Sequence, residues 1–204
     1  MNYISEIIQT ILSKDPAARS YLEVYFTYSG VKALRAHQKA HKLYLKGHYF
    51  WARVISERAR RKTGIDIHPG ATIGRRVFID HGVGVVIGET AVVGDDVVIY
   101  QGVTLGGTGK EKGKRHPTIE DRVMLSAGAK VLGPFTVGHD SKIGAGSVVL
   151  KEVPPYSTVV GIPGQIVKMK DQKVVQMDQI HIPDPIKEEL NRLENKIDQL
   201  KEVQ

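Results

Sequence analysis

Two short stretches of this 204-residue chain carry the residue types best suited to acid–base chemistry: Asp66-Ile67-His68-Pro69 and Asp80-His81-Gly82. An imidazole oriented by a carboxylate is the usual arrangement for a general base that takes a proton from a hydroxyl group. No Ser or Cys in a nucleophile motif accompanies the two stretches, and the sequence contains no Cys. The pattern therefore predicts a base that activates the substrate's own hydroxyl, or water. In the competing interpretation, these residues lie at chain corners, where their side chains bond turn amides.

The elements that position these residues are indicated by an aliphatic side chain at every sixth position between residues 67 and 153. This period is typical of neither helices nor alternating strands. We expect each hexad to form a short strand and a corner, with Gly in the tight corners and three corners closing a triangular coil. Such a coil, eighteen residues long, brings Asp66 and His81 nearly into line. An antiparallel sandwich is the alternative, but its turns would be spaced less regularly.

The leading residues of the hexads are expected to point inward and to stack three hexads apart, so that Ile67, Val85 and Val103 form one ladder. They are Ile67, Ile73, Ile79, Val85, Ala91, Val97, Val103, Ile119, Leu125, Val131, Val137, Ile143 and Val149. The Gly- and Lys-rich residues 106–117 interrupt the register, so we expect them to leave the coil as a loop. This loop ends in Arg115-His116, a fixed cation beside a titratable imidazole, which favours a functional role.

Three segments follow from these patterns. Residues 1–64 are predicted to form a helical domain of four helices, the second of which starts at Asp15-Pro16. Residues 65–166 are the solenoid domain, in which Pro154-Pro155 stops the repeat and one irregular strand leaves the coil. Residues 167–204 are a tail with a short helix, whose heptad residues pair in an oligomer: Ile186, Leu190, Leu193, Ile197 and Leu200. The predicted fold class is mainly β solenoid, with an N-terminal helical domain and a C-terminal helical tail.

Composition narrows the class of protein. The net charge is +7, but the basic residues are scattered without aromatic residues between them, so an anionic small molecule is a better partner than nucleic acid. The sequence shows neither a signal peptide nor a bilayer-spanning apolar stretch, so we expect a soluble cytoplasmic protein with no membrane partner. His37 and His41 have the spacing of a metal pair. Without an HExxH motif or a third ligand, they are predicted to be surface or interface histidines.

Six motifs follow one another along the solenoid: Asp66-Ile67-His68-Pro69, Ile79-Asp80-His81, VIGETAV at 86–92, QGVTLGGTG at 101–109, Arg115-His116-Pro117 and IGAGSVV at 143–149. In this order and spacing they resemble the serine O-acetyltransferase family of hexapeptide-repeat acyltransferases. The resemblance covers about residues 15–166 and includes Asp15-Pro16-Ala17 in the helical part. It implies a left-handed parallel β-helix that transfers the acetyl group of acetyl-CoA to the hydroxyl of L-serine. The product, O-acetylserine, would serve cysteine biosynthesis.

The resemblance also implies a role for each matching residue. His81 is expected to be the general base on the serine hydroxyl, and Asp66 the carboxylate that orients its ring. The serine amino group would meet two carboxylates, and the serine carboxylate would meet a cation and an imidazole: Asp15 and Asp80, then Arg115 and His116. A zwitterion needs groups of opposite charge at its two ends, which agrees with this division.

The coenzyme A pantetheine arm would be lined by residues that match family positions between neighbouring solenoids: Gly107, Thr108, Ala127 and Ala145. Three loop lysines either meet the coenzyme A phosphates or are solvated: Lys110, Lys112 and Lys114. Acetyl-CoA is then a co-substrate, and neither a permanently bound cofactor nor a metal is expected.

We further expect a homotrimer, because the family's active sites lie between neighbouring subunits. We expect no joining of two trimers, which in larger members depends on an N-terminal extension that residues 1–64 do not resemble. It ends in Gln204, whereas members that dock into O-acetylserine sulfhydrylase end in Ile, which argues against that complex. Three alternatives stay open: an acetyltransferase for a sugar, antibiotic or homoserine hydroxyl; a γ-type carbonic anhydrase with metal ligands among His81, His116 and His139; and a non-enzymatic scaffold.

Overall fold

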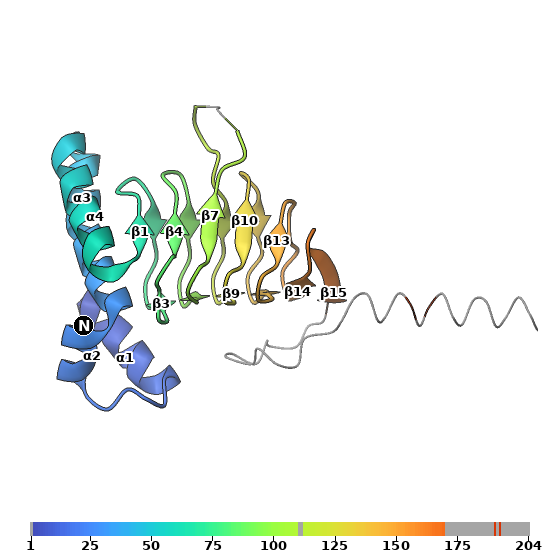
Figure 1. Ribbon diagram of the computed structural model, residues 1–204, viewed down its shortest axis with the longest axis horizontal. Helices are drawn as coiled ribbons and strands as arrows, with labels where there is room; N and C mark the ends of the chain where they lie inside the picture. Colours follow the sequence, from blue (N-terminus) through green and yellow to red (C-terminus); the bar gives the residue numbers. More distant parts are fainter. Residues whose placement is uncertain (1, 110–111, 170–189, 191, 193–204) are drawn as a thin grey trace, which may run out of the picture.

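The computed structural model describes residues 2–109, 112–169, 190 and 192. Four helices lie at one end of a three-sided coil of short strands (Figure 1). None of the helices in the described part of the chain is long and apolar enough to cross a membrane. The heptad residues of the predicted tail lie outside the described residues, except Leu190, which is helical and exposed.

The helices confirm the predicted number of four: α1 Tyr3–Lys14, α2 Tyr21–Thr27, α3 Ser29–Leu45 and α4 Tyr49–Thr63. The side chains of Asn2 and Ser20 cap α1 and α2 by accepting backbone N–H groups, and left-handed Gly64 ends α4. The predicted helix start at Asp15-Pro16 is wrong. Asp15 instead ends α1, and five residues of turn and coil precede Ser20, because Ser20 offers the hydroxyl that caps α2.

The coil is built from very short strands on three faces. They are β1 Asp66–Ile67, β2 Thr72–Ile73, β3 Phe78–Ile79, β4 Val86–Ile87, β5 Val92–Val93, β6 Val98–Ile99, β7 Thr104–Gly106, β8 Thr118–Ile119, β9 Met124–Leu125, β10 Lys130–Leu132, β11 Thr136–Val137, β12 Lys142–Ile143, β13 Val148–Val149, β14 Ser157–Val160 and β15 Gln165–Met169. The first sheet has the order β1-β4-β7-β10-β13, the second β2-β5-β8-β11, and the third β3-β6-β9-β12-β14-β15. All neighbours are parallel except β14 and β15, as the stacked arrows of Figure 1 illustrate.

Three lines of corners join the sheets, and we name them by the sheets they connect. Edge I joins the first sheet to the second, through residues 68–71, 88–91, 107–117 and 133–135. Edge II joins the second sheet to the third, through 74–77, 94–97, 120–123 and 138–141. Edge III joins the third sheet to the first, through 80–85, 100–103, 126–129 and 144–147. The predicted loop is confirmed as an excursion of edge I, except that Gly106 still belongs to β7; the described residues 107–109 and 112–117 leave the coil (Figure 1).

The predicted ladder of Ile67, Val85 and Val103 is wrong, because the observed pairing register differs from it by two residues. Ile67 pairs with Ile87, twenty positions on, whereas Ile87 pairs with Leu105 after the expected eighteen. The extra two residues lie in the connection 80–85, which is longer than the later connections of edge III. Val85 is nevertheless fully buried, because it lies two positions before Ile87 and so faces the same way.

The end of the solenoid also differs from the prediction. Pro154-Pro155 does not stop the coil, because Val153 still bridges to Val137 and β14 adds a parallel strand to the third sheet. The single irregular strand expected there is a hairpin, in which β15 turns back on β14. Proline is tolerated here because both residues lie in the connection between strands, where no ladder hydrogen bond is lost.

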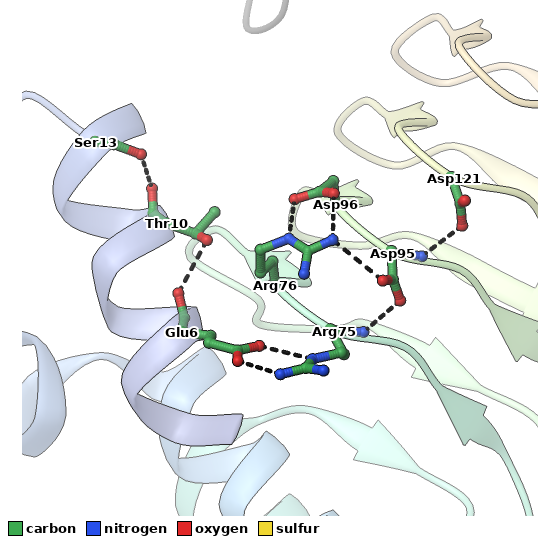
Figure 2. Close-up of polar contacts among 8 residues, drawn as sticks. All are labelled: Glu6, Thr10, Ser13, Arg75, Arg76, Asp95, Asp96 and Asp121. Carbon is green, nitrogen blue, oxygen red and sulfur yellow. Dashed lines mark hydrogen bonds and ion pairs between the residues drawn. The ribbon is translucent and has the colours of Figure 1, made fainter. Parts of the chain in front are cut away.

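Helix α1 is attached to edge II through charged groups (Figure 2). Its apolar face is buried, while the Glu6 carboxylate pairs with the guanidinium of Arg75. The next residue, Arg76, pairs with Asp96 on the following coil, with Nε and Oδ1 2.7 Å apart. The Glu6–Arg75 pair thus joins α1, the helix that Asp15 follows, to edge II, while the Arg76–Asp96 pair joins two successive corners of that edge.

Helix α3 approaches the third sheet closely through Gly30. A Cβ atom at this position would lie 2.3 Å from the backbone oxygen of Ile79. We therefore expect Gly30→Ala to push α3 away from β3 and to lower the free energy of unfolding by about 1–3 kcal/mol. Urea denaturation followed by circular dichroism measures this loss. Lys32→Ala, at an exposed site of the same helix, is the control and should change stability by less than about 0.5 kcal/mol. Equal midpoints for Gly30→Ala and the wild type would contradict the close approach.

Candidate active site

Asp80 and His81 begin the first connection of edge III, residues 80–85, which is two residues longer than the later ones. His81 is exposed and adopts the left-handed region at φ 55°, and Gly82 and Gly84 in the same corner also have positive φ. A non-Gly residue in this region is uncommon, although His is enriched there. The widened corner thus carries the imidazole out of the coil into solvent, where a substrate can reach it.

A second carboxylate comes from the helical domain. Asp15, at the end of α1, accepts hydrogen bonds from the Ala17 N–H at 2.8 Å and from the Tyr28 hydroxyl at 2.6 Å. Burial raises the pKa of the Asp80 carboxyl, His81 opposes this rise, and the nearby negative charge of Asp15 adds to it. Burial and the bond to Asp15 raise the pKa of Tyr28. Two neighbouring carboxylates whose charges repel one another are suited to bind an ammonium group.

Asp66 opens β1 on the first sheet, where its backbone pairs with Val86, five residues after His81. Its side chain is half-buried. Within the described residues, no hydrogen bond joins the Asp66 carboxylate to the His81 ring, so the orienting role of Asp66 stays a prediction. His68, from the same motif, is a corner residue, because its Nδ1 accepts the Gly70 N–H at 3.0 Å. For His68 the competing interpretation of a turn residue is therefore confirmed.

Arg115 and His116 lie at edge I, where Thr90 of the coil below holds both. The Thr90 hydroxyl oxygen accepts the backbone N–H groups of Arg115 at 3.0 Å and of His116 at 3.1 Å. The Thr90 N–H donates to Nδ1 of the His116 ring at 3.2 Å, which leaves Nε2 to carry the proton of the neutral imidazole. Burial and the neighbouring Arg115 lower the pKa of His116, which favours this neutral form. The ring is thus a hydrogen-bond donor at Nε2.

The Arg115 side chain is itself held by an acid. Its Nη2 lies 2.5 Å from Oε2 of Glu89, whose other oxygen accepts the Tyr44 hydroxyl of α3 at 2.8 Å. The bonds from Arg115 and then from Tyr44 hold the pKa of Glu89 below its ordinary value. Sequence reasoning missed Glu89, Thr90 and Tyr44 as site residues. Glu89 and Thr90 belong to the VIGETAV motif, which was a signal that could have identified them. Tyr44 was recognised only as part of a helix, from the spacing of its apolar neighbours.

The positions expected to line the pantetheine arm divide between two edges. Gly107 and Thr108 lie exposed on the edge I excursion, and Ala127 and Ala145 lie on edge III. The expected serine residues divide in the same way, with Asp15 and Asp80 near edge III and Arg115 and His116 at edge I. The first sheet separates the two edges, so one chain does not bring these two expected sets of residues together, and each set would be one half of a site.

The histidines proposed as metal ligands do not come together in one chain. His81, His116 and His139 lie on edges III, I and II respectively. The described residues contain no group of three or more His, Asp and Glu placed to hold a metal. His37 is buried, which lowers its pKa to about 4, and His41 contacts the backbone oxygen of Pro69 through Nδ1 at 2.7 Å. This pair therefore lies between α3 and the solenoid, as the interface prediction requires.

A three-sided coil of hexads with acid, histidine and arginine side chains on its corners is the architecture of the hexapeptide-repeat acyltransferases. No protein-family model matches the chain. The serine acetyltransferase of Bacillus subtilis is 60% identical over 200 residues, which are 97% of this chain and 92% of the relative. That of Staphylococcus aureus is 58% identical over 192 residues, 94% of this chain and 90% of the relative.

Solved structures agree. The Vibrio cholerae serine acetyltransferase has a TM-score of 0.84 at 45% identity, over 87% of this chain and 69% of that one. The Brucella abortus enzyme in complex with coenzyme A gives 0.80 at 45% identity, over 82% and 67%. The Neisseria gonorrhoeae enzyme in complex with serine gives 0.78 at 43%, over 81% and 67%. This chain belongs to the serine acetyltransferase family. The predicted left-handed β-helix of hexapeptide repeats is thereby confirmed.

The close packing of His116 on Gly88 provides a test of this site. A Cβ atom on Gly88 would lie 2.0 Å from Cδ2 and 2.1 Å from Nε2 of His116. We expect Gly88→Ala to displace the ring and to lower the rate of thiol release from acetyl-CoA by about 10²-fold, since such displacements of a positioned group have that effect. The double variant Gly88→Ala/His116→Ala removes the ring and should regain the thermal stability that Gly88→Ala loses. Wild-type activity in Gly88→Ala would place His116 outside the site.

Proposed function

We propose that this chain transfers the acetyl group of acetyl-CoA to the hydroxyl of L-serine, giving O-acetylserine and coenzyme A for cysteine biosynthesis. The relatives at about 60% identity carry the name of this activity. The Neisseria gonorrhoeae relative was solved with serine, and the Brucella abortus relative with coenzyme A. The acyltransferase class and the use of acetyl-CoA as co-substrate follow from membership of the family.

The observation that carries the proposal is the separation of charge between the two half-sites. Near edge III, the carboxylates of Asp15 and Asp80 lie close enough for the charge of Asp15 to affect the pKa of Asp80. At edge I, Arg115 and the Nε2–H of His116 supply donors for an anion. Serine is a zwitterion, so its ammonium group suits the first half-site and its carboxylate suits the second. A sugar or antibiotic hydroxyl offers no such pair of charges.

The reaction then needs a base at the serine hydroxyl, and we assign this role to His81. The hydroxyl oxygen attacks the carbonyl carbon of the thioester while the imidazole takes its proton. The carbon–sulfur bond breaks, and the sulfur leaves with the proton that His81 returns. We propose that Asp66 orients the ring during this cycle, from its place at the start of β1. Transfer is direct, because the chain has no Cys to hold the acetyl group and no Ser in a nucleophile motif.

We assign the pantetheine arm to the small residues already placed on the two edges: Gly107, Thr108, Ala127 and Ala145. Small side chains allow a ligand to approach the backbone closely. Of the three loop lysines, Lys114 already donates from Nζ to the backbone oxygen of Thr90 at 2.8 Å. This contact favours a role in holding the loop over a role at the coenzyme A phosphates. Lys110 lies outside the described residues, and Lys112 is exposed.

A complete site requires a second copy of the chain, because the half-sites lie on different edges. Edge III of one copy would face edge I of its neighbour. Such a contact joins two different surfaces, and it closes into a ring when the rotation between copies permits. A three-sided coil suits three-fold packing, so we propose a homotrimer with one site at each of its interfaces. A cytoplasmic location stays a prediction.

The assignment of the base is tested at His81. Because His81 has φ 55°, the variant of choice is His81→Asn, since Asn tolerates the left-handed region and lacks a base. We expect turnover with serine to fall by about 10²–10⁴-fold, with little change in the affinity for acetyl-CoA. Thiol release from acetyl-CoA should be measured with serine, homoserine and sugars as acetyl acceptors. His48→Ala, at an exposed position, is the control. Near-normal turnover in His81→Asn would remove this residue from the mechanism, and wild-type preference for a sugar would refute the proposed substrate.

A further inference from the structure

We propose that Glu89, fixed by Tyr44 of α3, is a positioning residue that holds Arg115 in the orientation that binds the serine carboxylate. The inference rests on the proposed function, because it takes the carboxylate site at Arg115 as given. It adds two residues to that site and gives helix α3 a part in binding the substrate.

The Glu89 carboxylate uses both of its oxygens. One oxygen accepts from Nη2 of Arg115 at 2.5 Å, and the other accepts from the Tyr44 hydroxyl at 2.8 Å. The side chains of Arg115 and Glu89 are each 30% exposed, so the ion pair is partly shielded from solvent. Glu89 therefore connects a cation on the edge I excursion to a helix that precedes the solenoid.

Tyr44 is held in place by the rings and the corner that it packs against. Its ring lies edge-on to Tyr49 at 5.0 Å and to His68 at 5.8 Å between centroids. A Cβ atom on Gly70 would come within 3.0 Å of Cζ of Tyr44, so the ring packs directly on the first corner of edge I. The same helix contacts this corner again through His41 and the backbone oxygen of Pro69. The Tyr44 hydroxyl is thus a fixed donor.

The Arg115 guanidinium still has N–H donors left to bind a substrate. Nη2 is used by Glu89, and Nη1 makes a long contact with the backbone oxygen of Gly113 at 3.4 Å. In the described part of the chain, Nε makes no hydrogen bond. Arg has five N–H donors in a planar fork, and fixing one corner of the fork directs the others. Without Glu89, the long side chain would sample many rotamers before it met a carboxylate.

Glu89 has a second effect, which decides the design of the test. Its negative charge lies close to Arg115 and so weakens the attraction of the site for a carboxylate. Glu89→Gln would remove that charge and the fixed geometry together, and the two effects on serine binding have opposite signs. Tyr44→Phe removes only one hydrogen bond, leaves every charge in place and keeps the packed ring. It is therefore the informative variant.

The experiment compares Michaelis constants for the wild type, Tyr44→Phe, Arg115→Ala and the double variant. We expect Tyr44→Phe to raise the constant for serine about three- to ten-fold, as the loss of one hydrogen bond does, and to leave that for acetyl-CoA unchanged. Arg115→Ala should raise the serine constant further. In the double variant the effect of Tyr44→Phe should vanish, because the group that it positions is gone. Tyr49→Phe, whose ring contacts Tyr44, is the matched control and should behave as the wild type.

Each outcome decides the matter. An unchanged serine constant in Tyr44→Phe, or effects of the two substitutions that multiply in the double variant, would overturn the positioning role while leaving the carboxylate site intact. A serine constant unaffected by Arg115→Ala would refute the carboxylate site, and the positioning role with it. If Tyr44→Phe instead impaired folding in general, its turnover and its thermal midpoint would both fall. A thermal midpoint equal to that of Tyr49→Phe excludes this explanation.

Discussion

The stacking of parallel coils in register is the constraint on which the rest of this structure depends. Each strand on the first three coils is two or three residues long and has no stability of its own. Its backbone is satisfied only by the coil above and the coil below, and its inward side chains are buried only in the ladder they share. The first sheet's ladder of Ile67, Ile87, Leu105, Val131 and Val149 is buried throughout. In a solenoid of this kind, the spacing of residues in the sequence determines where they lie, because corners at corresponding places in the repeat form straight edges.

The same constraint explains why the residues that we propose for catalysis and serine binding on the solenoid lie at departures from the repeat. A regular corner has room only for turn residues, such as the left-handed glycines at 102, 128 and 146 of edge III. His81 lies in the corner that is two residues too long, and Arg115 and His116 lie at the end of the excursion from edge I. Each insertion carries side chains out of the packed coil without disturbing the ladder below. Thr90 and Glu89 then fix the end of the excursion to the neighbouring coil.

Much of the fold could be predicted from the sequence, because helical spacing and a six-residue period are local signals. The two-residue slip at edge III could not, since Val85 and Ile87 are both aliphatic and both face inward, so either register fits the pattern. The helix start expected at Asp15-Pro16 was wrong for a similar reason: Asp-Pro is a common helix start, and only the tertiary structure shows that the Asp15 carboxylate accepts from the Tyr28 hydroxyl. The contact of Tyr44 with Glu89 spans 45 residues and depends on how α3 meets edge I, for which the sequence holds no local signal.

The central claim is that each active site joins edge III of one subunit to edge I of its neighbour. It is tested most directly by mixing two impaired variants, His81→Asn and Arg115→Ala, each of which damages a different half-site, at a serine concentration low enough that both variants alone turn over slowly. With equal co-expression, about a quarter of all interfaces should be undamaged, because each site draws its two halves independently from two kinds of subunit; a trimer that contains both variants has one undamaged interface of its three. We therefore predict that the mixture regains about a quarter of wild-type turnover. Activity no higher than that of the separate variants, in mixed trimers verified by mass spectrometry, would contradict the account and place both halves of the site in one chain.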